Sequence, residues 1–145
     1  MRRSKKRRHR GDIMSVEKRS TLMSKIRGKN TGPERAVSRR FASLRLRWAS
    51  HDTSLPGTPD FVFSRQRVVI FVDGDFWHGW RFPTWKDKLS LKWEQKIERT
   101  RQRDAAARSK LRNSGWRVIR IWEHQIERDL DQCVSKVLAV LDQRK

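Results

Sequence analysis

Residues 54–80 read SLPGTPDFVFSRQRVVIFVDGDFWHGW, and this stretch decides the fold. The segment Arg67–Val72 contains the unbroken apolar run VVIFV, which is typical of a central strand buried on both faces of a sheet. A second strand is expected over Asp60–Phe63, joined to the first as a hairpin through residues 64–66. Two prolines and a glycine in residues 55–59 exclude regular pairing and predict a rigid turn ahead of the hairpin.

Outward from this hairpin, helical and strand patterns alternate along the 145 residues. Before it, TGPE at residues 31–34 fits a capping box, with Thr31 as the N-cap of a helix that carries Val37, Phe41 and Leu44. The remaining predicted segments are helices at Ser15–Arg27, Ser90–Asn113 and Glu127–Leu141, strands at Leu46–Ala49 and Arg117–Trp122, and a loop over residues 79–88. This order predicts one α/β domain.

The chain is strongly basic, with 36 Lys and Arg against 16 acidic residues and a net charge of +20. Residues 1–10 carry many of these charges without an apolar run, so we expect a disordered basic arm over residues 1–14 and a folded domain over residues 15–145. The domain is basic in its own right, which favours a polyanionic partner such as double-stranded DNA. Charge alone favours a basic protein that binds nucleic acid without chemistry, as a ribosomal protein does.

Cysteine content and hydropathy limit the other classes of function. Cys133 is the only cysteine, so a disulfide framework and a cysteine-rich zinc site are both excluded. The longest apolar run, in residues 68–72, is far too short to span a bilayer. We expect a monomeric bacterial protein of the cytoplasm, associated with the nucleoid and with no membrane partner.

Two acidic residues stand where the pattern calls for apolar ones. Asp60 opens a strand after the turn, and Asp73 ends the apolar strand. The hairpin lets these ends converge, and carboxylates at strand ends on a basic surface commonly hold Mg²⁺ against a phosphate. Taken singly, each also fits a turn-forming aspartate.

Asp104 and Glu34 are two further candidates on helices. Asp104 falls on the apolar stripe of its predicted helix, where a carboxylate is costly unless it is paired. It is therefore either a structural ion pair with an arginine such as Arg101 or Arg108, or a residue that orients the active site. Glu34 fits both the capping box and a supporting role at the site.

The segment between these acids supplies a histidine and two adjacent aromatic residues. His78 follows Asp73 by five residues and can take a proton from an attacking water, although a surface-loop histidine is the simpler alternative. Phe76 and Trp77 are large enough to enter a base stack as a wedge, and they equally fit a seal at the edge of the core.

The strings SLPGTPDFVF and VVIFVDGDFWHGW together resemble the very-short-patch-repair (Vsr) endonuclease family, whose pattern is close to LPGxPDFVF and VxFVDGCFWHGC. The similarity continues through the helix and strand of KWEQKIERTRQRDAAARSKLRNSGWRVIRIWEHQI and includes TLMSKIRGKNTGPE. It covers the chain from about Ser15 to Val140. The ordered set of motifs is specific, whereas a Pro-Asp before a strand is weak alone.

The resemblance implies a restriction-endonuclease-like α/β core with a central mixed β-sheet. It also implies a Mg²⁺-dependent endonuclease that nicks one strand of duplex DNA beside a T·G mismatch. By position, Asp60 and the main chain at Val72 would bind the metal, His78 would be the general base, and other site residues would support them. The supporting residues would be Asp73, Asp104 and Glu34. The aromatic wedge beside the mismatch would consist of Phe76, Trp77 and Trp93. Contacts with DNA are also expected from Met23, Lys25 and Arg27 of the amino-terminal stretch.

The sequence departs from the family pattern at the structural zinc site. Asp75 and Trp80 stand where the family has cysteine, and only His124 remains near the position of another ligand. We therefore expect no structural zinc, with the aromatic residues of the following loop bracing it instead. Two alternatives stay open: a sequence-specific homing or restriction-type nuclease on the same fold, and a basic DNA-binding module that has lost catalysis.

Overall fold

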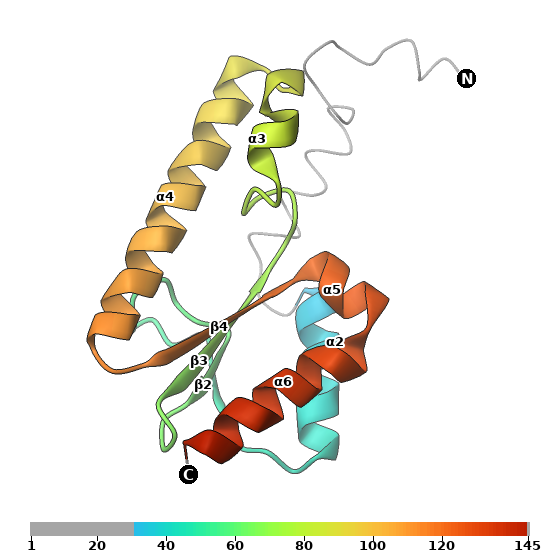
Figure 1. Cartoon of the computed structure of the whole chain (residues 1–145), viewed down its shortest axis with the longest axis vertical. Helices are drawn as coiled ribbons and strands as arrows, with labels where there is room; N and C mark the ends of the chain where they lie inside the picture. The colour runs from blue at the N-terminus through green and yellow to red at the C-terminus, as the bar shows by residue number, and fades with distance from the viewer. Residues whose placement is uncertain (1–30, 145) are drawn as a thin grey trace.

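The computed structural model describes residues 31–144, which form an α/β fold. In chain order the elements are α2 (Gly32–Ser43), β1 (Ala49–Ser50), β2 (Phe61–Phe63), β3 (Val68–Asp73), α3 (Phe82–Trp85), the 3-10 helix η2 (Lys86–Lys88), α4 (Leu91–Asn113), β4 (Arg117–Trp122), α5 (Glu123–Arg128) and α6 (Leu130–Gln143). The strands form one mixed sheet in the order β1-β2-β3-β4 (Figure 1). The expected mixed sheet flanked by helices is confirmed, while the arm and the helix predicted at Ser15–Arg27 lie outside the described residues.

Strand β3 is the centre of this sheet. It pairs antiparallel with β2, where Ile70 faces Phe61, and parallel with β4, where Ile70 faces Ile119. Val68, Val69 and Ile70 are fully buried. The continuous apolar run therefore marks a strand covered on both faces, as predicted.

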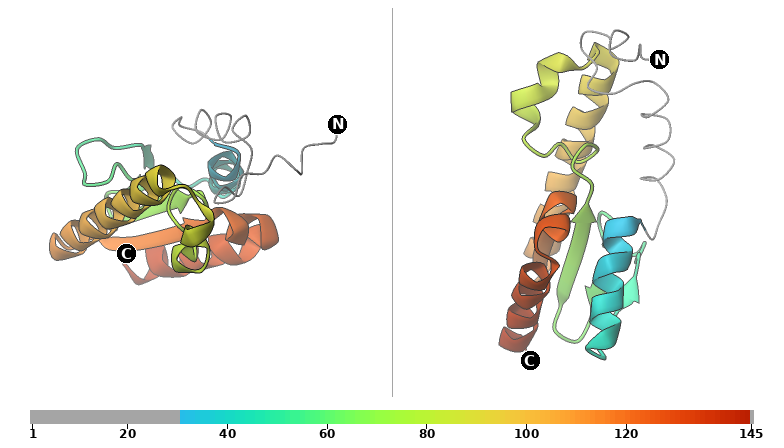
Figure 2. Two further views of the ribbon diagram at one scale, coloured as in Figure 1. Left: turned by 90° about the horizontal axis from the view of Figure 1, so that it is seen from above. Right: turned by 90° about the vertical axis from the view of Figure 1, so that its right-hand side faces the viewer.

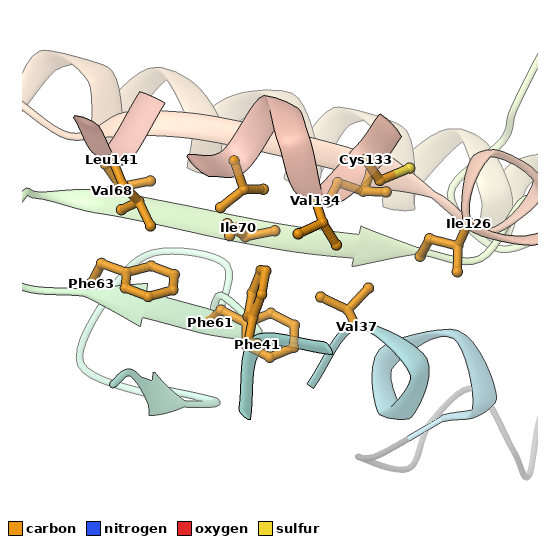
Figure 3. Close-up of a cluster of buried hydrophobic side chains, with 12 residues drawn as sticks. Val37, Phe41, Phe61, Phe63, Val68, Ile70, Ile126, Cys133, Val134 and Leu141 are labelled. Carbon is orange, nitrogen blue, oxygen red and sulfur yellow. The ribbon is translucent and has the colours of Figure 1, made fainter. Parts of the chain in front are cut away.

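Helices cover the two faces of the sheet (Figure 2). On one face, Val37 and Phe41 of α2 and Val134 of α6 pack against alternate residues of β2 and β3, including Ile70 (Figure 3). On the other face, Leu111 of α4 packs against the residues of β2 and β3 whose side chains point to that side. Because successive strand residues face opposite sides, a single apolar run serves both layers.

A separate aromatic cluster joins the segment after β3 to the amino-terminal half of α4. Its buried members are Trp77, Phe82, Leu89 and Ile97. The expectation of a plain loop over residues 79–88 is wrong, because α3 and η2 fold within it. Pro83 in the first turn of α3 favours a helix start, and Phe82 and Trp85 meet edge to face at 5.3 Å.

The carboxyl-terminal helix expected at Glu127–Leu141 is two helices, α5 and α6. Asp129 separates them with a non-helical backbone, and its side chain accepts a hydrogen bond from the Gln132 amide at 3.1 Å. This aspartate caps α6 and so begins a new helix in place of continuing the old one. No helix within residues 31–144 is both long and apolar enough to cross a membrane.

The other boundaries shift by a few residues. The N-cap prediction is confirmed, because the Thr31 side chain accepts from the Glu34 amide at 3.4 Å. Strand β1 is shorter and later than the predicted Leu46–Ala49. Arg45 takes a left-handed backbone with φ of 61°, and the Leu46 amide donates a hydrogen bond to the Phe41 carbonyl. These residues therefore form the carboxyl-terminal cap of α2 and are not part of a strand.

Candidate active site

Acidic residues predicted from the sequence meet at one end of the sheet. Asp60 immediately precedes β2 and Asp73 is the last residue of β3, and antiparallel pairing brings these strand ends together. The side chains form two groups, in each of which three possible ligand atoms lie within 4.8 Å of one another. The groups are Glu34, His51 and Asp60, and Asp73, His78 and Asp104.

The first group joins α2 to the turn before β2. Glu34 in the first turn of α2 is buried, and its Oε2 forms a hydrogen bond with Nε2 of His51. The same nitrogen lies 3.8 Å from Oδ1 of Asp60. His51 has a left-handed backbone with φ of 51°, a conformation uncommon for a residue with a side chain. Such a conformation persists only where the surrounding structure holds it, as the contacts with Glu34 and Asp60 do here.

Asp60 is the residue with the most perturbed carboxylate. Its Oδ2 accepts a hydrogen bond from the Val72 amide at 2.7 Å, which holds it beside β3. Burial, together with the negative charges of Glu34 and Asp73, raises the pKa of Asp60 to about 7. A cation next to Asp60 would relieve this cost.

In the second group, His78 lies between two carboxylates. Its Nδ1 is 2.6 Å from Oδ2 of Asp104 on α4, and its Nε2 is 3.6 Å from Oδ1 of Asp73. Burial alone would lower the pKa of His78, but the hydrogen bond with Asp104 and the charges of Asp73 and Asp104 outweigh it, so the pKa is raised. With Nδ1 donating to Asp104, Nε2 is left with the lone pair that accepts a proton.

Arg120 of β4 contacts both carboxylates of this second group. It forms an ion pair through Nε with Oδ2 of Asp73, and its Nη2 lies 3.6 Å from Oδ2 of Asp104. Asp104 thus has a partner, as its place on the apolar stripe required, although the arginine comes from a strand and is neither Arg101 nor Arg108.

Of the two groups, the first fits a divalent cation better. A metal ion bound between Asp73 and Asp104 would face the positive guanidinium of Arg120. Asp60 and Glu34 instead offer carboxylate oxygens, the ligands that Mg²⁺ prefers, in a setting that disfavours unneutralised negative charge.

Comparisons with known proteins identify the family of this chain. Residues 11–83 match the family model for DNA mismatch endonuclease Vsr. A type II nicking enzyme of Xanthomonas oryzae pv. oryzae is 40% identical over 136 residues, which cover 90% of this chain and 97% of the relative. The chain belongs to the Vsr family. It is accordingly a DNA endonuclease.

Two more relatives are similar to this chain over most of their length. A type II nicking enzyme of Neisseria meningitidis serogroup C is 35% identical over 132 residues, covering 87% of both chains. The DNA mismatch endonuclease Vsr of Escherichia coli K12 is 33% identical over 117 residues, covering 77% of this chain and 73% of the relative.

The three aromatic residues expected to form the Vsr wedge lie together but differ in burial. Trp77 is 7% exposed and packs within the aromatic cluster. Phe76 and Trp93 are half-buried at its surface, where Phe76 stacks on Trp85 with ring centres 5.7 Å apart. Phe76 and Trp93 are therefore partly accessible at the surface of the cluster, whereas Trp77 is buried within it.

The residues at the position of the Vsr zinc site do not fit zinc. Oδ1 of Asp75 lies 2.8 Å from Nδ1 of His124, and the indole of Trp80 lies over the His124 ring with centres 4.3 Å apart. An indole supplies no zinc ligand, and among residues 31–144 neither group of clustered ligand atoms includes Asp75 or His124. We call these three residues the clasp, because they join the segment after β3 to the start of α5.

The structure adds two residues to the site that were not predicted from the sequence. It does not test three residues that are expected to contact DNA. His51 lies in an irregular turn, and nothing in the sequence around it indicates its contacts. Arg120 could have been found, since it shares one face of β4 with the partly buried Val118 and so occupies a position where a charge is unexpected. The expected DNA contacts Met23, Lys25 and Arg27 lie outside the described residues.

Proposed function

We propose that this Vsr-family endonuclease nicks one strand of duplex DNA next to a T·G mismatch, with Mg²⁺ as its cofactor. The observation that carries the proposal is the pairing of His78 with Asp104 at 2.6 Å beside a second group that fits a divalent cation. A histidine oriented by a carboxylate is the usual arrangement of a general base. The nicking enzymes among the relatives support cleavage of one strand.

Asp60 and the main-chain carbonyl of Val72 would hold the metal ion. The hydrogen bond between the Val72 amide and Asp60 keeps the two residues adjacent, and Glu34 adds negative charge to the same place. When bound, a divalent ion polarises the scissile phosphate and stabilises the charge that develops on it. The side chains of the protein would carry out the other steps, including removal of a proton from the attacking water.

His78 would act on the attacking water. Its Nε2 takes the proton, and Asp104 accepts the Nδ1 hydrogen bond throughout, so the imidazole keeps the required tautomer and its positive charge is stabilised. Asp73, on the opposite side of the ring at 3.6 Å, adds to that stabilisation. Both carboxylates would act by their position beside the imidazole.

A set of labelled duplexes tests this function. Each strand in turn carries the label, and otherwise identical duplexes hold T·G, T·A or C·G at one position in a panel of sequence contexts. We expect a Mg²⁺-dependent nick in one strand of the T·G duplex alone. Equal nicking of matched duplexes would indicate a sequence-specific nuclease, and binding without any nick would indicate a binding module.

Recognition of the mismatch would depend on the wedge. We expect Phe76→Ala to weaken binding of the T·G duplex about tenfold more than binding of the T·A duplex, since stacking on a base contributes roughly 1–3 kcal/mol. Phe76→Leu keeps the bulk but not the flat ring, so its affinity for the T·G duplex should lie between those of the wild type and Phe76→Ala. Equal losses on both duplexes, measured by titration in Ca²⁺ to prevent cleavage, would remove Phe76 from the wedge.

A further inference from the structure

Arg120 occupies an unusual place in β4. Strand alternation puts it on the same side as Val118, which packs with buried residues of the sheet and α4. Its side chain is only 22% exposed. A charged side chain at such a position is stable only with partners, and those of Arg120 are the two carboxylates around His78.

The four ionisable groups close into a ring. Arg120 contacts Asp73 through Nε and Asp104 through Nη2 at 3.6 Å, and His78 contacts the same two residues through Nε2 at 3.6 Å and Nδ1 at 2.6 Å. Each carboxylate therefore has one partner on the guanidinium and one on the imidazole. The orientation of either carboxylate is set from two sides.

The ring is fixed to the sheet by a neighbouring aromatic residue. The guanidinium carbon of Arg120 lies 4.2 Å from the ring centre of Trp122, two residues further along β4. Stacking on an indole restricts the plane of the guanidinium and so the direction of its hydrogen-bond donors. Lysine at this position would keep the charge but lose the planar fork.

We propose that Arg120 is a positioning residue of the nuclease, which aligns Asp73 and Asp104 and through them the imidazole of His78. This inference rests on the proposed role of His78 as general base. In this role Arg120 would act through the two carboxylates that it contacts and not on the water or the phosphate. Its loss would let Asp104 turn away from Nδ1, and the His78 proton would then move to Nε2, where it blocks proton uptake from water.

The test compares Arg120→Gln and Arg120→Lys with the matched control Arg117→Gln, an exposed arginine on the same strand. Single-turnover nicking at saturating protein removes differences in DNA affinity. We expect a rate loss of about 10–100-fold for Arg120→Gln, as for loss of other residues that orient a site, partial rescue in Arg120→Lys, and no loss in Arg117→Gln. A rate for Arg120→Gln equal to that of the control overturns the proposal.

A spectroscopic readout separates alignment from a general weakening of the fold. Nitrogen-15 shifts of the His78 ring, measured above its pKa in protein free of metal and DNA, report which ring nitrogen carries the proton. We expect the Nδ1-protonated form in the wild type and a larger Nε2-protonated fraction in Arg120→Gln, or in Arg120→Lys if the glutamine variant does not fold. An unchanged tautomer overturns the proposal.

These two readouts also separate this inference from the proposed function. The tautomer measurement needs no cleavage, so it tests Arg120 even if the wild type nicks no T·G duplex. Loss of nicking in His78→Ala tests the base itself.

Discussion

At the scale of single residues, Asp60 lies where its charge opposes folding. Its pKa of about 7 stands above the ordinary 3.8, so the folded chain binds this proton more tightly than the unfolded chain does. Stability from this group is therefore present below pH 4 and is lost as the pH rises towards 7.

Replacing this charge should separate stability from activity. We expect Asp60→Asn to raise the melting temperature by several degrees at pH 8 without metal, while abolishing nicking and leaving duplex affinity within a few fold. The matched control is Asp87→Asn, the same change at an exposed position. Residual cleavage by Asp60→Asn near the wild-type rate would contradict its assignment as metal ligand.

His51 makes the second prediction at this scale. It contacts both Glu34 and Asp60, so His51→Ala should let these carboxylates separate and raise the Mg²⁺ concentration needed for half-maximal nicking about 10–100-fold. A metal titration of the nicking rate measures this, with Glu34→Gln as the parallel variant. Unchanged metal dependence in His51→Ala would limit its role to local packing.

The sequence allowed prediction of the site's acids but not of its second histidine. Asp60, Asp73 and Asp104 interrupt apolar patterns, and burial of a carboxylate is informative because it is costly. His51 interrupts no pattern, since it lies in an irregular turn, and its contacts depend on a left-handed backbone that no single residue type signals. Tertiary geometry alone brings it to Glu34.

At the scale of elements, the clasp links the segment after β3 to α5 through side-chain contacts, and we predict that it does so without zinc. We expect His124→Ala to lower the melting temperature by several degrees, because it loses both the Asp75 hydrogen bond and the Trp80 contact. Chelator should leave the wild-type melting curve unchanged, and elemental analysis should find no stoichiometric zinc. A large fall in melting temperature on chelation would show that ligands complete a zinc site after all.

Elements with strong periodic patterns were predictable, and breaks within a pattern were not. The apolar run of β3 and the stripe of α4 gave their segments within a residue or so, because burial repeats along them. The break at Asp129 was not predicted, because the apolar spacing continues across it. A signal was present: Asp129 is followed by Gln132 just ahead of an apolar run, the pattern of a capping box.

At the scale of the whole molecule, the two groups of the site predict one pH dependence. Asp60 must lose its proton to bind metal and His78 must be neutral to act as base, and both pKa values are raised. Nicking should therefore increase from pH 6 to pH 8. Mg²⁺ competes with the proton on Asp60 but not with the proton on His78. Saturating Mg²⁺ should therefore shift the fall of the nicking rate at low pH to a lower pH, until protonation of His78 alone sets that fall.

Rate profiles at limiting and saturating Mg²⁺ measure this difference. A fall in rate at the same low pH at both concentrations would mean that protonation of Asp60 does not limit metal binding in this pH range. A rate that falls between pH 6 and pH 8 would contradict both assignments.

The crowding of aromatic rings around the site has an optical consequence. Trp77 and Trp93 are 5.5 Å apart in the aromatic cluster, and Trp80 and Trp122 are 5.2 Å apart beside the clasp. Indoles this close share their excited states, so each pair should give its own exciton band in ultraviolet circular dichroism. If DNA draws the wedge outward, the band of the first pair should collapse while that of the second persists. The enzyme would thus signal mismatch engagement without any added label.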